Sequence, residues 1–134
     1  MATTYKPQGY TAVTPYFIVA GADRFIEFLK NGFDAEELER NTRPDGSIQH
    51  AACRIGDSIV EIGGGTNKDF PPMQNAIHLF VEDADEVYRR ALQAGARSLY
   101  EPQNHEYGER SGGVEDPFGN HWYIATAIST SSFD

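Results

Sequence analysis

An internal repeat constrains the fold of this chain more than any other feature. A strand-like run, a short loop and a helix-like run occur twice, first as PYFIVAGADRFIEFLKNGFDAEEL and again as AIHLFVEDADEVYRRALQAGARSL. Pairing Val19 with Val81 gives an offset of 62 residues, and two such halves cover almost the whole chain. We therefore expect a single domain built from two similar modules. The predicted boundaries are residues 1–134 for the domain, about 10–65 and 74–128 for the modules, and about 63–73 for the linker.

Both halves show the same order of secondary-structure signals. Asp23 and Asp85 are typical helix N-caps, and each precedes apolar residues at helical spacing. Gly32 and Gly95 are typical of helix C-termini. The strand-like runs that follow are residues 36–42, 48–54 and 58–62 in the first half, and 97–100, 112–115 and 121–127 in the second. This order predicts an α+β fold of two tandem βαβββ modules.

Composition and charge exclude several classes of protein. The chain has 20 acidic and 11 basic residues and a net charge of −9, which disfavours nucleic acid and anionic membranes as partners. No apolar stretch is long enough to cross a bilayer, and the first residues lack a secretory signal pattern, so we expect a cytoplasmic protein. The single cysteine, Cys53, excludes an internal disulfide and is interpreted as a buried thiol.

The linker contains a run of three glycines, from Gly63 to Gly65. A phosphate-binding loop would continue with Gly-Lys-Ser/Thr and open a helix, and this segment does neither. We interpret it as a connection between the modules.

Alternation along the strands separates an apolar face from a more polar one. The apolar sets, which should pack under the helices, are Phe17 and Val19 in the first half and Ile77, Leu79 and Val81 in the second. The opposite faces gather Tyr16, Glu61, His78, Phe80, His121 and Tyr123. Buried polar groups need partners, whereas a ligand cavity combines aromatic walls with a few polar groups, so these faces favour a cavity. An ordinary hydrogen-bonded role stays open for each histidine.

The duplicated layout, together with the segment YGERSGGVEDPFGNHWYIA, resembles the vicinal oxygen chelate superfamily. That superfamily includes glyoxalase I, extradiol dioxygenases and bleomycin-resistance proteins, and the C-terminal segment is similar to its PhnB-like branch. The resemblance implies that the modules form a curved mixed sheet around a small-molecule cavity, with the helices on the outer face. It also implies a homodimer.

Enzymes of this superfamily bind a divalent metal through one residue on the first and one on the last strand of each module. The corresponding positions are Thr14, Glu61, Ala76 and Tyr123. Only Glu61 is a competent ligand, because threonine and neutral tyrosine are weak donors and alanine has none. A displaced set of Glu61, His78 and His121, two histidines and one carboxylate, stays open as an alternative.

The segment HEYGER, residues 105–110, concentrates polar groups, and the resemblance places it at the mouth of the cavity. Tyr107 and Arg110 are candidates to hold an anionic part of a ligand, since arginine offers a two-pronged donor. The alternative is that Arg110 pairs with a nearby acid and Tyr107 fills a corner.

The sequence therefore predicts a metal-independent small-molecule binding protein without a cofactor, serving to sequester an antibiotic or toxic compound. The predicted ligand-binding residues are Tyr16, Glu61, His78, Phe80, Tyr107, Arg110, His121 and Tyr123. The acidic charge and the aromatic rings would suit a cationic ligand. A metal-dependent lyase, isomerase or dioxygenase is an alternative, so enzymatic activity stays open, as does a domain that acts only through its dimer surface.

Overall fold

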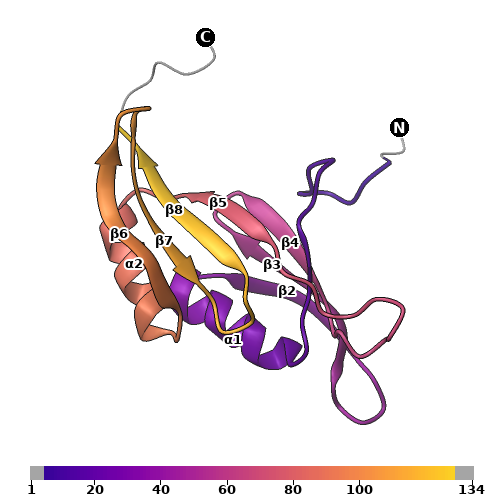
Figure 1. Cartoon of the computed structure of the whole chain (residues 1–134). Coiled ribbons are helices and arrows are strands. Elements are labelled where there is room, and N and C mark those ends of the chain that lie inside the picture. Colours follow the sequence, from indigo (N-terminus) through magenta and orange to yellow (C-terminus); the bar gives the residue numbers. More distant parts are fainter. Residues whose placement is uncertain (1–4, 129–134) are drawn as a thin grey trace. The chain divides into compact units, whose positions relative to one another are not determined.

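The computed structural model describes residues 5–128, which form eight strands and two helices (Figure 1). In chain order these are β1 (Tyr16–Ile18), α1 (Ala22–Phe33), β2 (Glu36–Thr42), β3 (Ile48–Ile55), β4 (Ser58–Gly63), β5 (Ala76–Phe80), α2 (Ala84–Gln93), β6 (Arg97–His105), β7 (Glu109–Glu115) and β8 (His121–Ala127). The chain divides into two compact units. Within the described residues, unit 1 contains 5–30 and Asp34–Met73, and unit 2 contains Asn31–Phe33 and 74–128. The predicted α+β fold of two tandem βαβββ modules is confirmed.

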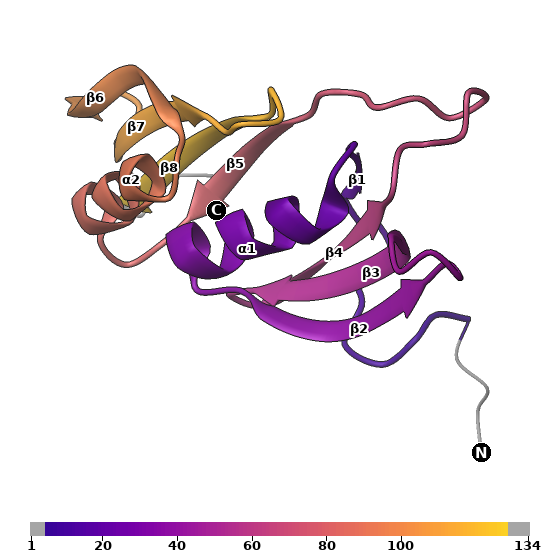
Figure 2. The ribbon, with the colours of Figure 1, turned by 90° about the horizontal axis from the view of Figure 1, so that it is seen from below.

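Unit 1 contains a four-stranded mixed sheet with the order β1-β4-β3-β2. β1 runs parallel to β4, with Tyr16 opposite Glu61, and β3 is antiparallel to both of its neighbours. Figure 2 shows α1 alongside this sheet. The rings of Phe17 on β1 and Phe25 on α1 lie 5.0 Å apart, and both are fully buried. The core of unit 1 is therefore built from apolar side chains.

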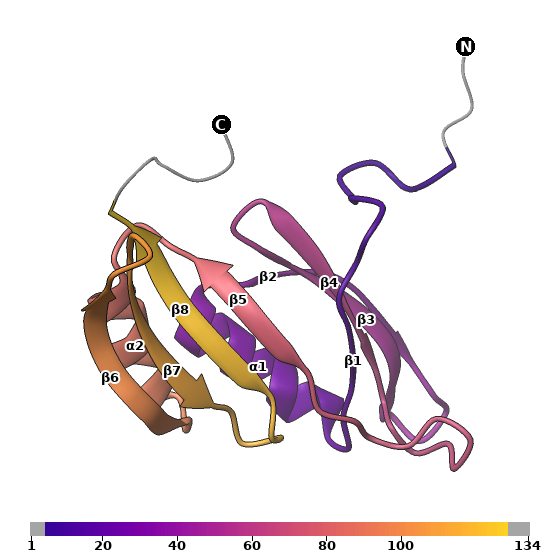
Figure 3. The same ribbon diagram turned by 45° about the horizontal axis from the view of Figure 1, so that its top comes forward.

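Unit 2 repeats this topology in the order β5-β8-β7-β6, with β5 parallel to β8. α2 packs against β6, β7 and β8, behind the strands in the view of Figure 3. Tyr88 of α2 lies over Gly112 of β7, where a Cβ atom would be only 2.9 Å from its ring. The Tyr88 hydroxyl donates to Ser98 Oγ at 2.6 Å. Gly112 thus allows a large side chain of the helix to approach the sheet.

A buried carboxylate organises the turn between β7 and β8. Asp116 is 3% exposed and accepts hydrogen bonds from Phe118 N at 2.8 Å, Asn120 N at 3.0 Å and Trp122 Nε1 at 2.9 Å. Trp122 is fully buried and lies 4.6 Å from the Phe33 ring. The core of unit 2 therefore combines apolar packing with a satisfied polar network, as buried charge requires.

The helix N-termini differ from the sequence prediction. The N-cap of α1 is Gly21, and the N-cap of α2 is Asp83, whose carboxylate accepts a hydrogen bond from Glu86 N at 3.2 Å. Asp23 and Asp85 lie in the first helical turns instead. The helix dipole favours acidic residues throughout the first turn, so their presence alone does not fix which residue is the cap.

At the C-termini the prediction was right for one helix. Gly95 follows α2 with a φ of 115°, as expected for a glycine at a helix end. α1 instead continues through Gly32, which is buried inside the helix, and ends at Phe33, with Asp34 as its C-cap in the left-handed conformation. Gly32 is therefore a buried residue within the helix and does not terminate it.

The strands follow the predicted runs closely, except in the β6–β7 hairpin. The prediction ended the first of these strands at residue 100 and began the second at 112, whereas β6 extends to His105 and β7 begins at Glu109. Pro102 lies where the pairing register shifts, between Tyr100 and Gln103, so the strand accommodates a residue without an N–H donor. As a result, Glu109, which was predicted to lie in a loop, belongs to strand β7 of the sheet.

The predicted apolar faces are confirmed most fully in unit 1. Phe17 and Val19 are buried, whereas Ile77 and Leu79 on β5 and the adjoining Val81 are half-buried. Cys53 is fully buried, as predicted. Neither helix in residues 5–128 is long and apolar enough to cross a membrane.

Candidate functional site

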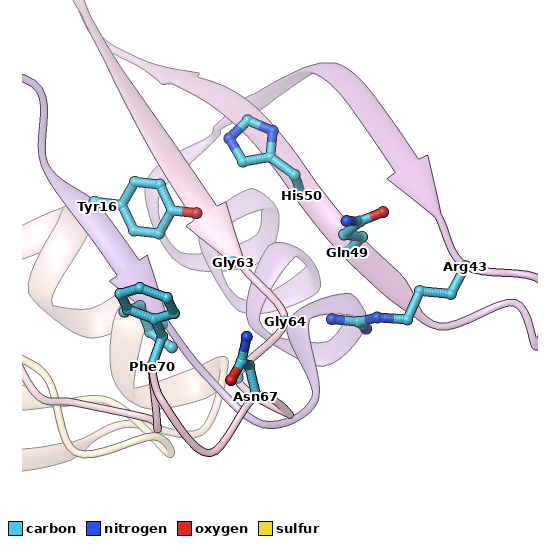
Figure 4. Close-up of a pocket in the computed structure, with 10 residues that line it drawn as sticks. Tyr16, Arg43, Gln49, His50, Gly63, Gly64, Asn67 and Phe70 are labelled. Atoms are coloured by element: carbon cyan, nitrogen blue, oxygen red, sulfur yellow. The ribbon is translucent and has the colours of Figure 1, made fainter.

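A pocket of about 550 Å³ opens in unit 1 (Figure 4). It is lined by Tyr16, Ile18, Arg43, Gln49, His50, Gly63, Gly64, Gly65, Asn67 and Phe70. These residues come from β1, the β2–β3 turn, β3, the end of β4 and the segment after it. The volume is in the range of small-molecule binding sites.

One wall of the pocket is built on the strand register. Tyr16 pairs with Glu61 across β1 and β4, and His50 pairs with Gly63 across β3 and β4. A Cβ atom on Gly63 would lie only 2.9 Å from the Tyr16 hydroxyl. The Tyr16 ring can therefore lie over the strand because Gly63 has no side chain. The Tyr16 and His50 rings are 6.0 Å apart. Two rings from different strands thus share one face.

A hydrogen-bonded histidine–carboxylate pair lies on this face. His50 Nε2 is 3.1 Å from Glu61 Oε1, and both side chains are less than one-third exposed. His50 Nδ1 is 3.9 Å from Glu39 Oε1. Carboxylates from β2 and β4 thus flank the imidazole on its two nitrogen atoms.

The opposite side of the pocket carries a positive charge. Arg43 Nη1 donates to the Ile48 carbonyl at 2.9 Å and to Ser47 Oγ at 3.3 Å, which fixes the guanidinium. A Cβ atom on Gly64 would lie 3.0 Å from Arg43 Nη1 and 2.1 Å from the Ile48 oxygen, so only glycine fits there. Figure 4 shows Arg43 pointing toward Gly64 and Asn67, with the Tyr16 and Phe70 rings on the other side.

The linker forms part of the pocket as well as connecting the modules. Asn67 and Phe70 form a bridge, Asn67 Oδ1 accepts a hydrogen bond from Asp69 N at 2.8 Å, and Met73 pairs with Ile18 of β1. Phe70 is 65% exposed at the pocket edge. The glycine run and the residues that follow it therefore form part of the pocket wall.

A smaller pocket of about 280 Å³ lies in unit 1, where residues 7–10 meet β2, β3 and β4. Burial raises the pKa of Tyr10, which lines it, and the negative charges of Glu61 and Glu39 add to the shift. Tyr10 is thus within the electrostatic field of the carboxylates that flank His50.

Only part of the predicted ligand-binding set meets in the unit 1 pocket. Tyr16 lines it, and Glu61 adjoins it through His50. The remaining six belong to unit 2, namely His78, Phe80, Tyr107, Arg110, His121 and Tyr123.

Among the unit 2 candidates, His78 of β5 and Tyr123 of β8 are register partners. His78 stacks on Phe80 at 4.7 Å, and the Tyr123 hydroxyl is 3.5 Å from His121 Nδ1. Arg110 donates to both oxygens of Asp85, at 2.6 and 2.9 Å, which corresponds to the alternative in which it pairs with a nearby acid.

Sequence reasoning missed His50, Arg43 and Asn67 in unit 1, and Glu109 in unit 2. His50 could have been found, because alternation along the predicted strand at 48–54 puts it on the opposite face from Ala51 and Cys53. Arg43 and Asn67 depend on the conformations of a turn and a linker, which carry no periodic signal.

The positions that bind metal in enzymes of the resembled superfamily do not fit that role here. Thr14 Oγ1 donates to the Thr11 carbonyl at 3.1 Å, Ala76 offers no donor atom, and Tyr123 pairs with His121. In the alternative set, Glu61 hydrogen-bonds His50, while His78 and His121 contact Glu109 and Glu115. Within residues 5–128 no group of three or more His, Cys, Asp or Glu side chains could hold a metal ion.

Comparison with known proteins defines the family. The chain matches the Glyoxalase/Bleomycin resistance protein/Dioxygenase superfamily model over residues 10–124. It is 35% identical over 144 aligned residues to the uncharacterized protein Mb0911c of Mycobacterium bovis, an alignment that covers 100% of this chain and 92% of the relative. The chain belongs to the Glyoxalase/Bleomycin resistance protein/Dioxygenase superfamily.

Solved structures share the fold. TioX from Micromonospora sp. ML1 has a TM-score of 0.72 and 23% identity, covering 91% of this chain and 100% of TioX. The PhnB protein from Bacillus cereus has a TM-score of 0.67 and 18% identity, covering 87% of this chain and 100% of that protein. At these identities the likeness concerns the fold alone.

Proposed function

We propose that this protein binds a small organic molecule in the unit 1 pocket without a divalent metal, and that it sequesters an antibiotic or toxic compound. The observation that carries the proposal is the pocket of about 550 Å³, with aromatic rings on one side and a fixed guanidinium on the other. The poor fit of Thr14, Ala76 and Tyr123 to metal binding supports the metal-independent form.

The pocket favours a ligand with two parts. Tyr16 and Phe70 offer aromatic surface to a flat apolar group. Arg43 has N–H donors beyond those bonded to Ser47 and Ile48, and a carboxylate would accept two of them. An aromatic carboxylate therefore matches both sides of the pocket.

The test uses 2-naphthoate and its neutral analogue 2-naphthalenemethanol, with affinity measured by calorimetry. We expect 2-naphthoate to bind more tightly, and Arg43→Ala to weaken it about tenfold or more, since a charge-assisted hydrogen bond contributes roughly 1.5–3 kcal/mol. Arg89→Ala is the matched control, because Arg89 pairs with Glu86 on the exposed face of α2. Equal affinity in wild type and Arg43→Ala would contradict this binding mode.

Metal independence is tested by elemental analysis of protein purified without chelator. We expect no stoichiometric divalent metal and unchanged 2-naphthoate binding after EDTA treatment. One equivalent of metal whose removal abolishes binding would overturn the proposal and favour the metal-dependent lyase, isomerase or dioxygenase.

The His50–Glu61 pair supports a second candidate, metal-free proton transfer to a molecule bound in the same pocket. The 3.1 Å contact places a carboxylate behind an imidazole that lines the pocket, an arrangement suited to a general base. Loss of turnover in Glu61→Gln with unchanged ligand affinity would distinguish catalysis from binding.

We also propose that the protein belongs to the PhnB-like branch, forms a homodimer and is located in the cytoplasm. The fold shared with the Bacillus cereus PhnB protein supports the first. Light scattering after size exclusion should give twice the chain mass of 14.9 kDa, and a single chain mass would contradict the dimer.

A further inference from the structure

Unit 2 contains a carboxylate that is buried yet only half satisfied. The Glu109 side chain on β7 is 9% exposed, and its Oε1 is 3.1 Å from His78 Nε2. Its Oε2 is buried and meets no hydrogen-bond donor within the described part of the chain. A buried carboxylate oxygen without a donor is costly, so this atom calls for a positively charged or N–H-bearing partner.

A second unsatisfied atom lies on the neighbouring strand. His105 of β6 is the register partner of Glu109, and its Nε2 is likewise buried without a hydrogen-bond partner among residues 5–128. Because the two unsatisfied atoms belong to residues that are paired across the strands, they define a single location.

The cation nearest to Glu109 in the sequence does not neutralise it. Arg110 alternates to the other face of β7 and holds Asp85 of α2 in a two-pronged contact, with Asn104 as a further acceptor. Arg110 is therefore not the partner that Glu109 Oε2 lacks.

Aromatic rings flank the carboxylate. Phe80 is 63% exposed and stacks on His78, while Tyr107 is 66% exposed and stacks on His105 at 5.1 Å. Desolvation and the nearby Glu109 charge raise the pKa of Tyr107, which places its hydroxyl in the field of this carboxylate. Exposed aromatic faces attract cations, and most strongly beside an acidic group.

We infer a second ligand site in unit 2, centred on Glu109, that binds an organic ammonium group attached to a flat apolar body. The ammonium donates to Glu109 Oε2, and the apolar body lies against Phe80 and Tyr107. Because Oε2 is buried in the free protein, neighbouring side chains move to admit the ammonium group. All of its residues belong to unit 2, so the site does not rest on the function proposed for the unit 1 pocket.

The experiment is an NMR titration of the full chain with benzylammonium chloride and with benzyl alcohol as the neutral analogue. Benzylammonium should bind saturably and shift the side-chain signals of His78 and His105, with an affinity at least tenfold above that of benzyl alcohol. Glu109→Gln should lower the benzylammonium affinity at least tenfold. Glu101→Gln, which changes an exposed acid on β6, should leave it unchanged.

Equal binding of the alcohol, unchanged affinity in Glu109→Gln, or no saturable binding would each overturn the inference. Should Glu109→Gln fail to fold, Tyr107→Leu provides the second variant, because its ring is exposed. Tyr107→Leu should weaken benzylammonium binding several-fold, and an unchanged affinity would equally contradict the site.

Discussion

The two units share a topology but stabilise their cores differently. Unit 1 relies on fully buried apolar side chains, with Phe17 of β1 against Phe25 of α1. Unit 2 relies on Trp122 and on the buried Asp116, which accepts hydrogen bonds from three residues of its turn and last strand. Duplicated strand order thus does not require duplicated interactions, and each half can acquire its own polar site.

The largest effect should come from the apolar core of unit 1. Phe25→Ala removes a fully buried ring and should lower the free energy of unfolding by about 3–5 kcal/mol, from lost burial and the cavity that remains. Urea denaturation measures the change. Phe80→Ala, which removes a ring that is 63% exposed, is the control and should cost less than about 1 kcal/mol. Similar losses in both variants would contradict the description of the core.

Removing the acceptor of the unit 2 network should be nearly as damaging. Asp116→Ala leaves the buried N–H groups of Asn120 and Trp122 without their partner and should destabilise the protein by about 3 kcal/mol. Asp45→Ala, which removes an exposed turn carboxylate bonded to Ser47, should cost less than about 1 kcal/mol. A loss below 1 kcal/mol in Asp116→Ala would mean that the network is not a source of stability.

The thiol in the core of unit 1 should make stability fall at high pH. Burial, followed by the charge of Glu37, raises the pKa of Cys53 from 9.0 to about 11. The thiol has a higher pKa in the folded protein than in the unfolded chain, so the folded state is favoured as long as the thiol stays protonated. This contribution to the free energy of unfolding is complete below about pH 9 and is lost as the pH rises toward 11. Wild type should lose about 2 kcal/mol more than Cys53→Ala between pH 8 and 11, and parallel pH profiles would contradict the burial of the thiol.

The smallest effect concerns the different helix N-termini. Asp83→Ala removes the side-chain acceptor of Glu86 N and should cost about 1 kcal/mol. α1 has no side-chain cap, because Gly21 stands at that position, so it has no equivalent bond to lose. Thermal unfolding checks the change, with Asp23→Ala as the control in the first turn of α1. An equal loss in both variants would point to helix-dipole effects rather than capping.

The sequence was sufficient for the topology because repeated periodic patterns specify it. Val19 and Val81 align the two halves, and alternation placed Tyr16 and Glu61 on one face, where the register pairs them. Arg43 and Asn67 were not predictable, since turn and linker conformations bring them to the pocket. Glu109 was missed because the predicted strands ended at residue 100 and resumed only at 112, and because the sequence carries no signal for an unsatisfied oxygen.

Amide chemical shifts during a 2-naphthoate titration of uniformly ¹⁵N-labelled protein test the central claim most directly. The account predicts saturable shifts at Gly63, Gly64, Gly65 and Asn67, all of which line the unit 1 pocket, and their loss in Arg43→Ala. Saturable shifts confined to unit 2, or pocket shifts that persist unchanged in Arg43→Ala, would contradict it.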